Sequence, residues 1–200
     1  MLFHRPACAW NGWPCDRCWM HPLTEHRQSA AGVKDFDPMR LTTLSGMQQK
    51  KHSDSVTIDV PAEVVYAVVS DIGRTGEWSP TCARCEWDDP QQRGVGATFT
   101  GYNETSSRTW QTTSTIIAAD PGVRFAWEVG KGFVRWSYDL RAVGTDTELT
   151  ESWTFLTAGL EYFAKQYDDQ AAAAIEERQK QAIADIPRTL AKIKAIAEAT

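Results

Sequence analysis

Two pairs of cysteines have a spacing that is found in zinc-binding and redox-active proteins. Cys15 and Cys18 form one Cys-x-x-Cys, and Cys82 and Cys85 form the other. Cys18 and Cys82 are separated by far more than the about 15 to 20 residues of a paired zinc site, so one shared site is not expected. In a strand, Cys82 and Cys85 would point to opposite faces, so we expect one thiol to face inward and the other outward.

The N-terminal pair also lies close to two histidines. Cys15, Cys18, His21 and His26 are acceptable zinc ligands in principle. Zinc fingers place about twelve residues between the cysteine pair and the histidine pair, and here the two pairs are almost adjacent. We therefore expect no metal site and no cofactor.

An acid–base site in this chain would have to use Glu151. All four histidines lie at or before residue 52, so the rest of the chain lacks the commonest general base. Burial would raise the pKa of Glu151, while Tyr138 and Asn103 on neighbouring strands could donate hydrogen bonds to an enolate oxygen. The alternative is a buried Glu151 that is satisfied by Arg108 or by nearby hydroxyls.

A β-sheet is needed to bring these side chains together. Apolar residues alternate with polar ones from Ser53 to Val60, which predicts a strand, and Pro61 suits the start of a short helix that ends near Asp71. A second short helix or turn then carries Trp78. Further strands are predicted over 82–88, 95–103, 107–119, 123–129, 133–142 and 147–156, separated by turn sequences such as DPG, GKG and GTD. The order predicts an antiparallel meander.

The final segment has a helical period. Its apolar stripe consists of Ile175, Ala182, Ile186, Leu190, Ile193 and Ala197. Pro187 lies within this stripe, so we expect a kink or a break between Asp185 and Pro187. One face of an antiparallel sheet needs an apolar cover, and the terminal helix is the element that can provide it.

Alternation along each strand identifies the side chains that face this helix. Aromatic residues dominate the set, and Glu151 and a few other polar groups share their face. We expect the ligand-binding site to be lined by Trp78, Phe99, Asn103, Arg108, Trp110, Thr112, Ser114, Trp127, Trp136, Tyr138, Glu151 and Trp153. Aromatic walls with a few polar groups are typical of pockets for small molecules, although aromatic residues also fill ordinary cores.

Composition limits the remaining possibilities. The 200 residues carry a formal net charge of −5, which does not favour nucleic acid as a partner, and no apolar run is long enough to cross a membrane. We expect a cytoplasmic protein. Residues 1–46 have no strand or helix period, so they are expected to be a disordered extension or an upstream segment from an over-early start assignment, and residues 47–200 form the domain.

The order of elements and the segments SVTIDVPAEVVYAVVSDIGRTGEWSP, VGATFTGYN, ADPGVRFAWEV, WSYDL and GTDTELTESW resemble a known family over about residues 53 to 198. It is the polyketide cyclase/dehydrase and lipid-transport family of the START/Bet v 1-like (SRPBCC) superfamily. The resemblance implies an α+β helix-grip fold, in which a curved antiparallel seven-stranded sheet wraps around a long C-terminal helix. It also implies a deep cavity for an apolar ligand.

Three functions remain open after this resemblance, because fold alone does not determine function. The first is binding of a small hydrophobic molecule, a lipid or a polyketide-like compound. The second is an aromatic polyketide cyclase or dehydratase that uses Glu151 as acid and base, with Tyr138 and Asn103 holding the enolate. The third is an interaction module with a filled core.

Overall fold

The computed structural model describes residues 49–106 and 108–200. The expected extension over 1–46, with Cys15, Cys18, His21 and His26, lies outside these residues. The elements in chain order are β1 (Lys51–Ile58), α2 (Ala62–Val69), η1 (Ile72–Glu77), β2 (Cys82–Trp87), β3 (Thr98–Thr105), β4 (Arg108–Asp120), β5 (Arg124–Val129), β6 (Val134–Val143), β7 (Asp146–Phe155), α3 (Thr157–Tyr167), η2 (Asp168–Gln170) and α4 (Ala171–Glu198).

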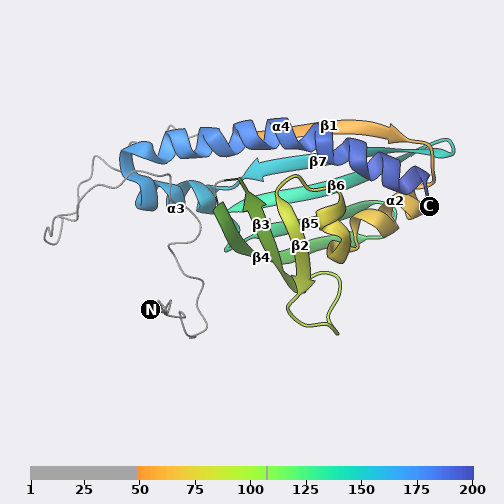
Figure 1. Cartoon of the computed structure of the whole chain (residues 1–200), viewed down its shortest axis with the longest axis horizontal. Coiled ribbons are helices and arrows are strands. Elements are labelled where there is room, and N and C mark those ends of the chain that lie inside the picture. Colours follow the sequence, from red (N-terminus) through yellow and green to blue (C-terminus); the bar gives the residue numbers. More distant parts are fainter. Residues whose placement is uncertain (1–48, 107) are drawn as a thin grey trace, which may run out of the picture. The chain divides into compact units, whose positions relative to one another are not determined.

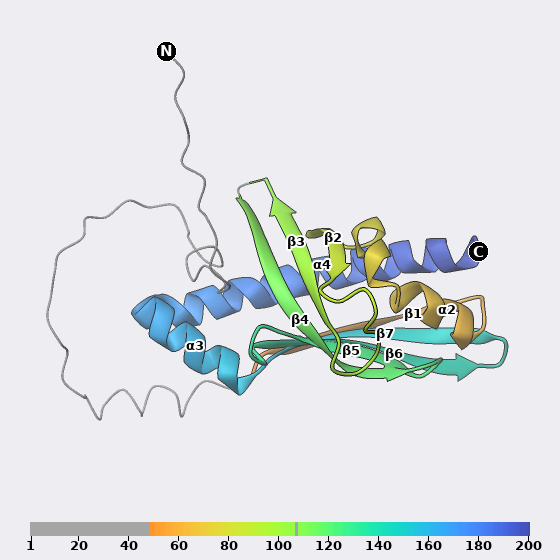
Figure 2. The same cartoon turned by 90° about the horizontal axis from the view of Figure 1, so that it is seen from below.

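The seven strands form one antiparallel sheet in the order β1-β7-β6-β5-β4-β3-β2. Strands β2 to β7 follow one another as a meander, and β1 joins the far side of β7. Figure 1 shows α4 lying along the sheet, and Figure 2 shows that β2, β3 and β4 curve away from the plane of β6 and β7 towards α4. The predicted helix-grip architecture is therefore confirmed.

The predicted hairpins follow from their turn residues. Gly122 and Gly144 have φ angles of 69° and 65°, a backbone conformation in which glycine avoids the steric cost that other residues meet. These glycines stand in the DPG and GTD sequences that separate β4 from β5 and β6 from β7. Because each turn is local, the sequence placed these strands to within about two residues.

Helix α4 covers the concave face of the sheet with its apolar stripe. Every predicted member of the stripe is buried, and Ile186, Ile193 and Ala197 have no exposed surface. The predicted break is wrong, because α4 continues as one α-helix through Pro187. Burial of the turns on both sides of the proline stabilises the helix against the loss of one backbone hydrogen bond.

A separate helix, α3, was not predicted from the sequence. It connects β7 to α4 and buries Leu160 and Phe163, and Phe163 packs edge-on against Phe155 with ring centroids 4.8 Å apart. The chain then reverses at Asp168, whose φ of 48° is the one positive value at a non-glycine residue in the described ranges. Gly159 lets α3 approach β6, since a Cβ at this position would lie 2.4 Å from the Phe133 carbonyl oxygen.

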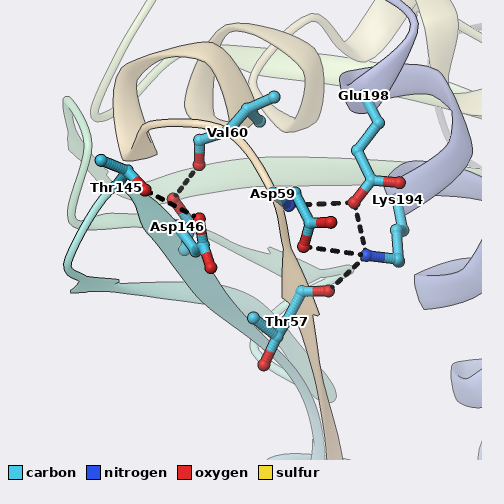
Figure 3. A network of polar contacts seen from close by, with 8 residues as sticks. Thr57, Asp59, Val60, Thr145, Asp146, Lys194 and Glu198 are labelled. Atoms are coloured by element: carbon cyan, nitrogen blue, oxygen red, sulfur yellow. Dashed lines mark hydrogen bonds and ion pairs between the residues drawn. The ribbon is translucent and has the colours of Figure 1, made fainter.

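The last turns of α4 are fastened to β1 by a polar network (Figure 3). The Lys194 ammonium donates to the Thr57 carbonyl oxygen at 2.8 Å and lies 3.5 Å from the Asp59 carboxylate. Glu198 pairs with Lys194 and accepts a hydrogen bond of 2.9 Å from the backbone N–H of Asp59. These contacts fix α4 against the edge strand at one end of the sheet.

Within the described part of the chain, no helix combines the length and the apolar character that a membrane crossing requires.

Candidate functional site

The concave face of the sheet is lined by aromatic rings. Trp127 on β5 stacks on Trp136 on β6 with ring planes 13° apart, and it also contacts Tyr138 at a centroid distance of 5.6 Å. Phe99 on β3 reaches Trp127 at 6.3 Å across the intervening strand β4, which is possible only on the inner side of the curve. The predicted inward orientation of these rings therefore agrees with the contacts, and Trp153 is buried on the same face.

Glu151 and Tyr138 lie directly opposite each other on β7 and β6. Both are almost completely buried, at 4% and 3% exposure. Burial raises the pKa of Glu151 well above its usual range, the contact with Tyr138 lowers it, and the charge of Asp185 raises it further. Burial and the nearby Glu151 also raise the pKa of Tyr138. Glu151 is thus a carboxyl group that keeps its proton to a higher pH than an exposed glutamate.

Trp78 reaches the same place from η1. Gly76 allows η1 to touch β2, because a Cβ there would lie 2.1 Å from the Ala83 carbonyl oxygen. Trp78 follows as the residue that caps η1, and only 1% of it is exposed. It is therefore a buried wall of the site rather than a cap on an open entrance. The contact with its indole N–H lowers the pKa of the Tyr138 hydroxyl. Trp78 Nε1 nevertheless makes no hydrogen bond among the described residues.

Helix α4 contributes a second buried carboxylate, Asp185, which was not among the predicted site residues. Its Oδ2 accepts hydrogen bonds from Gln181 Nε2 at 2.6 Å and from Thr81 Oγ1 at 3.3 Å. Its Oδ1 has one long ion pair, 3.8 Å from the exposed Arg188 guanidinium. In the sequence, Pro187 predicted a kink or a break between Asp185 and Pro187, and the buried carboxylate was not recognised.

Three polar atoms of this cluster have no hydrogen-bond partner among the residues that the structure describes. They are Trp78 Nε1, Glu151 Oε2 and Asp185 Oδ1. Each is buried, and a buried polar atom without a partner costs about 1–3 kcal/mol. In native proteins such atoms are usually satisfied by water or by a bound molecule. The arrangement therefore offers one N–H donor and two carboxyl oxygens to a small polar group.

A second polar group lies across the sheet on β3 and β4. Asn103 Nδ2 donates to the Gly101 carbonyl oxygen at 3.2 Å and to Thr112 Oγ1 at 3.3 Å, and Ser114 is buried on the same face. The expectation that Asn103 lies on a strand neighbouring Glu151 is wrong, because β6, β5 and β4 separate their strands. The amide of Asn103 is engaged by β3 and β4 rather than directed at Glu151.

Arg108 is not the counter-ion of Glu151. Its guanidinium lies over the Trp110 ring, 4.2 Å from the ring centroid. Burial lowers the pKa of Arg108, and the neighbouring Arg178 on α4 lowers it further. Burial raises the pKa of Tyr167 to about 12 in the same region. These residues form a separate basic and aromatic corner beside α3, and the alternative that Arg108 satisfies Glu151 finds no support.

The two cysteines of β2 both face inward, contrary to the expected one-in, one-out arrangement. The register shifts between Cys82 and Arg84, so Cys82 pairs with Asn103 and Cys85 with Gly101, two residues of one face. The two sulfur atoms lie 3.2 Å apart. Within residues 49–106 and 108–200, no group of three histidine, cysteine or acidic side chains could hold a metal ion.

Residues 49–191 match the family described as polyketide cyclase/dehydrase and lipid transport. No curated protein matches the chain. A solution structure of a Polyketide_cyc-like protein, Cgl2372 from Corynebacterium glutamicum, is 44% identical with a TM-score of 0.59, and the match covers 76% of this chain and 93% of that chain.

More distant structures share the fold alone. The Zhui aromatase/cyclase from Streptomyces sp. R1128 is 17% identical, with a TM-score of 0.54 over 76% of this chain and 94% of that chain. The di-domain ARO/CYC protein StfQ of the steffimycin biosynthetic pathway is 14% identical, with a TM-score of 0.59 over 76% of this chain. The chain spans about half of StfQ, 51% of its length.

Proposed function

The chain belongs to the polyketide cyclase/dehydrase and lipid-transport family, and on this premise we propose that it binds a small apolar molecule between the sheet and α4. The ligand is aromatic or lipid-like and carries at least one hydroxyl or carbonyl group. Its apolar part packs on the rings of β3, β5 and β6, and its polar group contacts the cluster of Trp78, Glu151 and Asp185.

The observation that carries this proposal is the set of three buried atoms without a hydrogen bond beside an aromatic surface. Trp78 Nε1 can donate to a ligand oxygen, while Glu151 Oε2 and Asp185 Oδ1 can accept from a ligand hydroxyl. Trp127 and Trp136 are only half-buried although they lie on the concave face, so part of their surface is available for contact. Apolar walls with a few convergent polar groups are the usual composition of a small-molecule site.

A matched pair of probes tests this proposal. The full chain is titrated with 2-naphthol and with naphthalene by isothermal titration calorimetry. One hydrogen bond to the buried cluster should favour 2-naphthol by about tenfold, or about 1.4 kcal/mol. Failure of both probes to bind would instead support the interaction module with a filled core.

Substitutions locate the contact. Glu151→Leu replaces the carboxyl-bearing side chain by an apolar one of similar size. It should abolish most of the preference for 2-naphthol. Glu148→Leu on the same strand is the control, because Glu148 points outward and pairs with Arg141 at the surface. An unchanged preference in Glu151→Leu, together with normal folding, would rule out the assigned polar contact.

A cyclase or dehydratase activity is the second candidate, and the pairing of Glu151 with Tyr138 favours it. A carboxyl group with a raised pKa is, in its ionised form, a stronger base than an exposed carboxylate and can take a proton from the carbon next to a ketone, and a buried phenol can donate to the resulting enolate oxygen. Asn103 is separated from Glu151 by three strands and has no part in this candidate activity. Tyr138 contacts Glu151, and Trp78 in turn contacts Tyr138.

This activity can be tested without the natural substrate. NMR in D₂O follows exchange of the methyl protons of 2-acetonaphthone, a ketone with the same naphthalene ring as the binding probe. The natural chain should accelerate exchange, and Glu151→Gln should lower the acceleration by about 10²-fold or more while 2-naphthol still binds. Equal exchange rates for the natural and Glu151→Gln proteins would exclude Glu151 as a base and leave ligand binding untouched.

A further inference from the structure

The bulge in β2 turns a Cys-x-x-Cys sequence into a contact between two thiols. Without the bulge, residues three apart on a strand would face opposite sides. The shift between Cys82 and Arg84 places both side chains over β3, where the sulfur atoms approach to 3.2 Å. This distance is a contact between the two sulfurs, and a short movement of either side chain would bring them to bonding distance.

Gly101 on β3 provides the space for this pair. A Cβ at Gly101 would lie 3.7 Å from the sulfur of Cys82 and 3.7 Å from that of Cys85, so both thiols rest on the same bare stretch of backbone. A Cβ there would be in ordinary van der Waals contact with both sulfurs, and a longer side chain would have to displace them. Since no third histidine, cysteine or acidic ligand joins them in the described residues, the pair is suited to sulfur–sulfur chemistry rather than to a metal ion.

The surroundings of the two thiols differ. Hydrogen bonds from the Cys82 thiol and from the Thr75 hydroxyl lower the pKa of Cys85, against the opposite effect of burial. The hydrogen bond to Cys85 raises the pKa of Cys82, and burial adds to this rise. The Cys82 sulfur also lies 3.2 Å from the Arg84 carbonyl oxygen, which is an alternative acceptor for its single S–H when that hydrogen is not donated to Cys85. Cys85 is therefore the thiol of the pair that ionises more readily, and Cys82 holds its proton more tightly.

We propose that Cys82 and Cys85 form a dithiol site that hydrogen peroxide oxidises to an intramolecular disulfide, with Cys85 attacking first and Cys82 resolving the intermediate. A small oxidant is required because Cys85 is 7% exposed and Cys82 is half-buried. This site is independent of the ligand proposed above, and neither proposal depends on the other.

The reaction balances in two steps. The Cys85 sulfur bonds to one peroxide oxygen, the O–O bond breaks, and the other oxygen leaves with a proton as water, which converts the thiolate to a sulfenic acid. Cys82 then loses its proton and attacks the Cys85 sulfur. The S–O bond breaks, and the second oxygen leaves as water. Two thiols are oxidised by two electrons in total, and one peroxide is reduced to two molecules of water.

The disulfide would form beside the proposed ligand site. The charge of Cys85 contributes to the raised pKa of Tyr138, so the thiolate and the phenol are electrostatically coupled. Oxidation removes that negative charge. It also fixes β2 at the bulge, directly beneath η1, which carries Trp78.

The test uses the full chain with Cys8, Cys15 and Cys18 replaced by serine, so that the β2 pair alone remains. After treatment with hydrogen peroxide, the protein is unfolded, alkylated with N-ethylmaleimide and weighed by mass spectrometry. We expect the loss of two hydrogens and no alkylation. Two alkylated thiols, or oxidation only to a sulfinic acid, would overturn the proposal.

Single substitutions assign the roles of the two thiols. In Cys82→Ser, the Cys85 sulfenic acid has no resolving partner and should be trapped by dimedone. In Cys85→Ser, dimedone should trap Cys82 after peroxide treatment at a rate at least about tenfold lower than it traps Cys85 in Cys82→Ser. Faster trapping at Cys82 than at Cys85 would contradict the proposed order of attack.

An equilibrium measurement shows whether the fold favours the disulfide, or whether the two cysteines are merely close in sequence. The same protein is equilibrated with mixtures of reduced and oxidised dithiothreitol, once folded and once in concentrated urea. Prearranged sulfurs should favour the disulfide in the folded protein by about tenfold, which corresponds to about 30 mV for a two-electron couple. An equal or smaller constant in the folded protein would show that the fold does not prepare the pair.

Discussion

Replacing Glu151 by glutamine should change how the stability of the protein depends on pH. Glu151 is 4% exposed, and burial is the largest cause of its raised pKa, followed in the same direction by Asp185, whereas contact with Tyr138 opposes the rise. The folded chain therefore holds a proton on Glu151 at pH values where the unfolded chain has released it. Raising the pH above the unfolded pKa of about 4.3 thus favours the unfolded state.

The size of the effect follows from this linkage. Between the unfolded and the folded pKa of Glu151, the free energy of unfolding should fall by up to about 1.4 kcal/mol for each pH unit. Glutamine has no proton to release, so the Glu151→Gln protein should gain stability relative to the natural chain by that amount per unit. Below the unfolded pKa the difference should level off, because both states of the natural chain are then protonated.

Urea unfolding at a series of pH values from mildly acidic to mildly alkaline measures this difference. Tryptophan fluorescence follows the transition, and Glu148→Gln on the outer face of the same strand reports what the substitution does at a surface ion pair. A difference between the natural chain and Glu151→Gln that is constant with pH, or that grows as the pH falls, would refute the assignment of a raised pKa to Glu151.

Two further predictions concern the elements that position the site. Ile193→Ala should lower the free energy of unfolding by about 2–5 kcal/mol because the side chain is 0% exposed, whereas Ile183→Ala on the same helix, at 45% exposure, should change it by less than about 1 kcal/mol. Urea unfolding checks both, and similar losses would contradict the burial of the stripe. Gly76→Ala should cost about 2 kcal/mol or more, because the new Cβ would lie 2.1 Å from the Ala83 carbonyl oxygen. Near-ultraviolet circular dichroism should show a changed environment of Trp78, and an unchanged spectrum and stability would contradict the tight contact.

Local patterns were sufficient to predict most of the sheet. The DPG and GTD sequences mark hairpins by themselves, and strict alternation placed Glu151 on the inner face together with Trp153. Wherever a strand is regular, knowing the side of one residue fixes the side of every other. The inner surface of β5, β6 and β7 could therefore be deduced from parity alone.

The parts that escaped prediction depend on contacts between distant segments. The bulge at Cys82 breaks the alternation, but no residue type in β2 indicates a bulge. The sequence therefore did not predict that both thiols lie on one face. The burial of Asp185 is tolerated because Gln181 and Thr81 donate hydrogen bonds to one of its oxygens, and Thr81 is far away in the chain. Pro187 is tolerated within α4 by packing on both sides, which propensity cannot reveal.

The position of β1 has a consequence for the way the chain folds. Among the residues that the structure describes, β1 pairs only with β7, and the hydroxyls of Ser55 and Thr150 meet across 95 residues of chain. Strands β3 to β7 can each pair with the strand before them as the ribosome releases them, but β1 must wait until β7 has been made. Closing so long a loop is entropically costly and slows folding. We therefore expect β1 to join last, and until then the edge of β7 stays open to pairing with another chain.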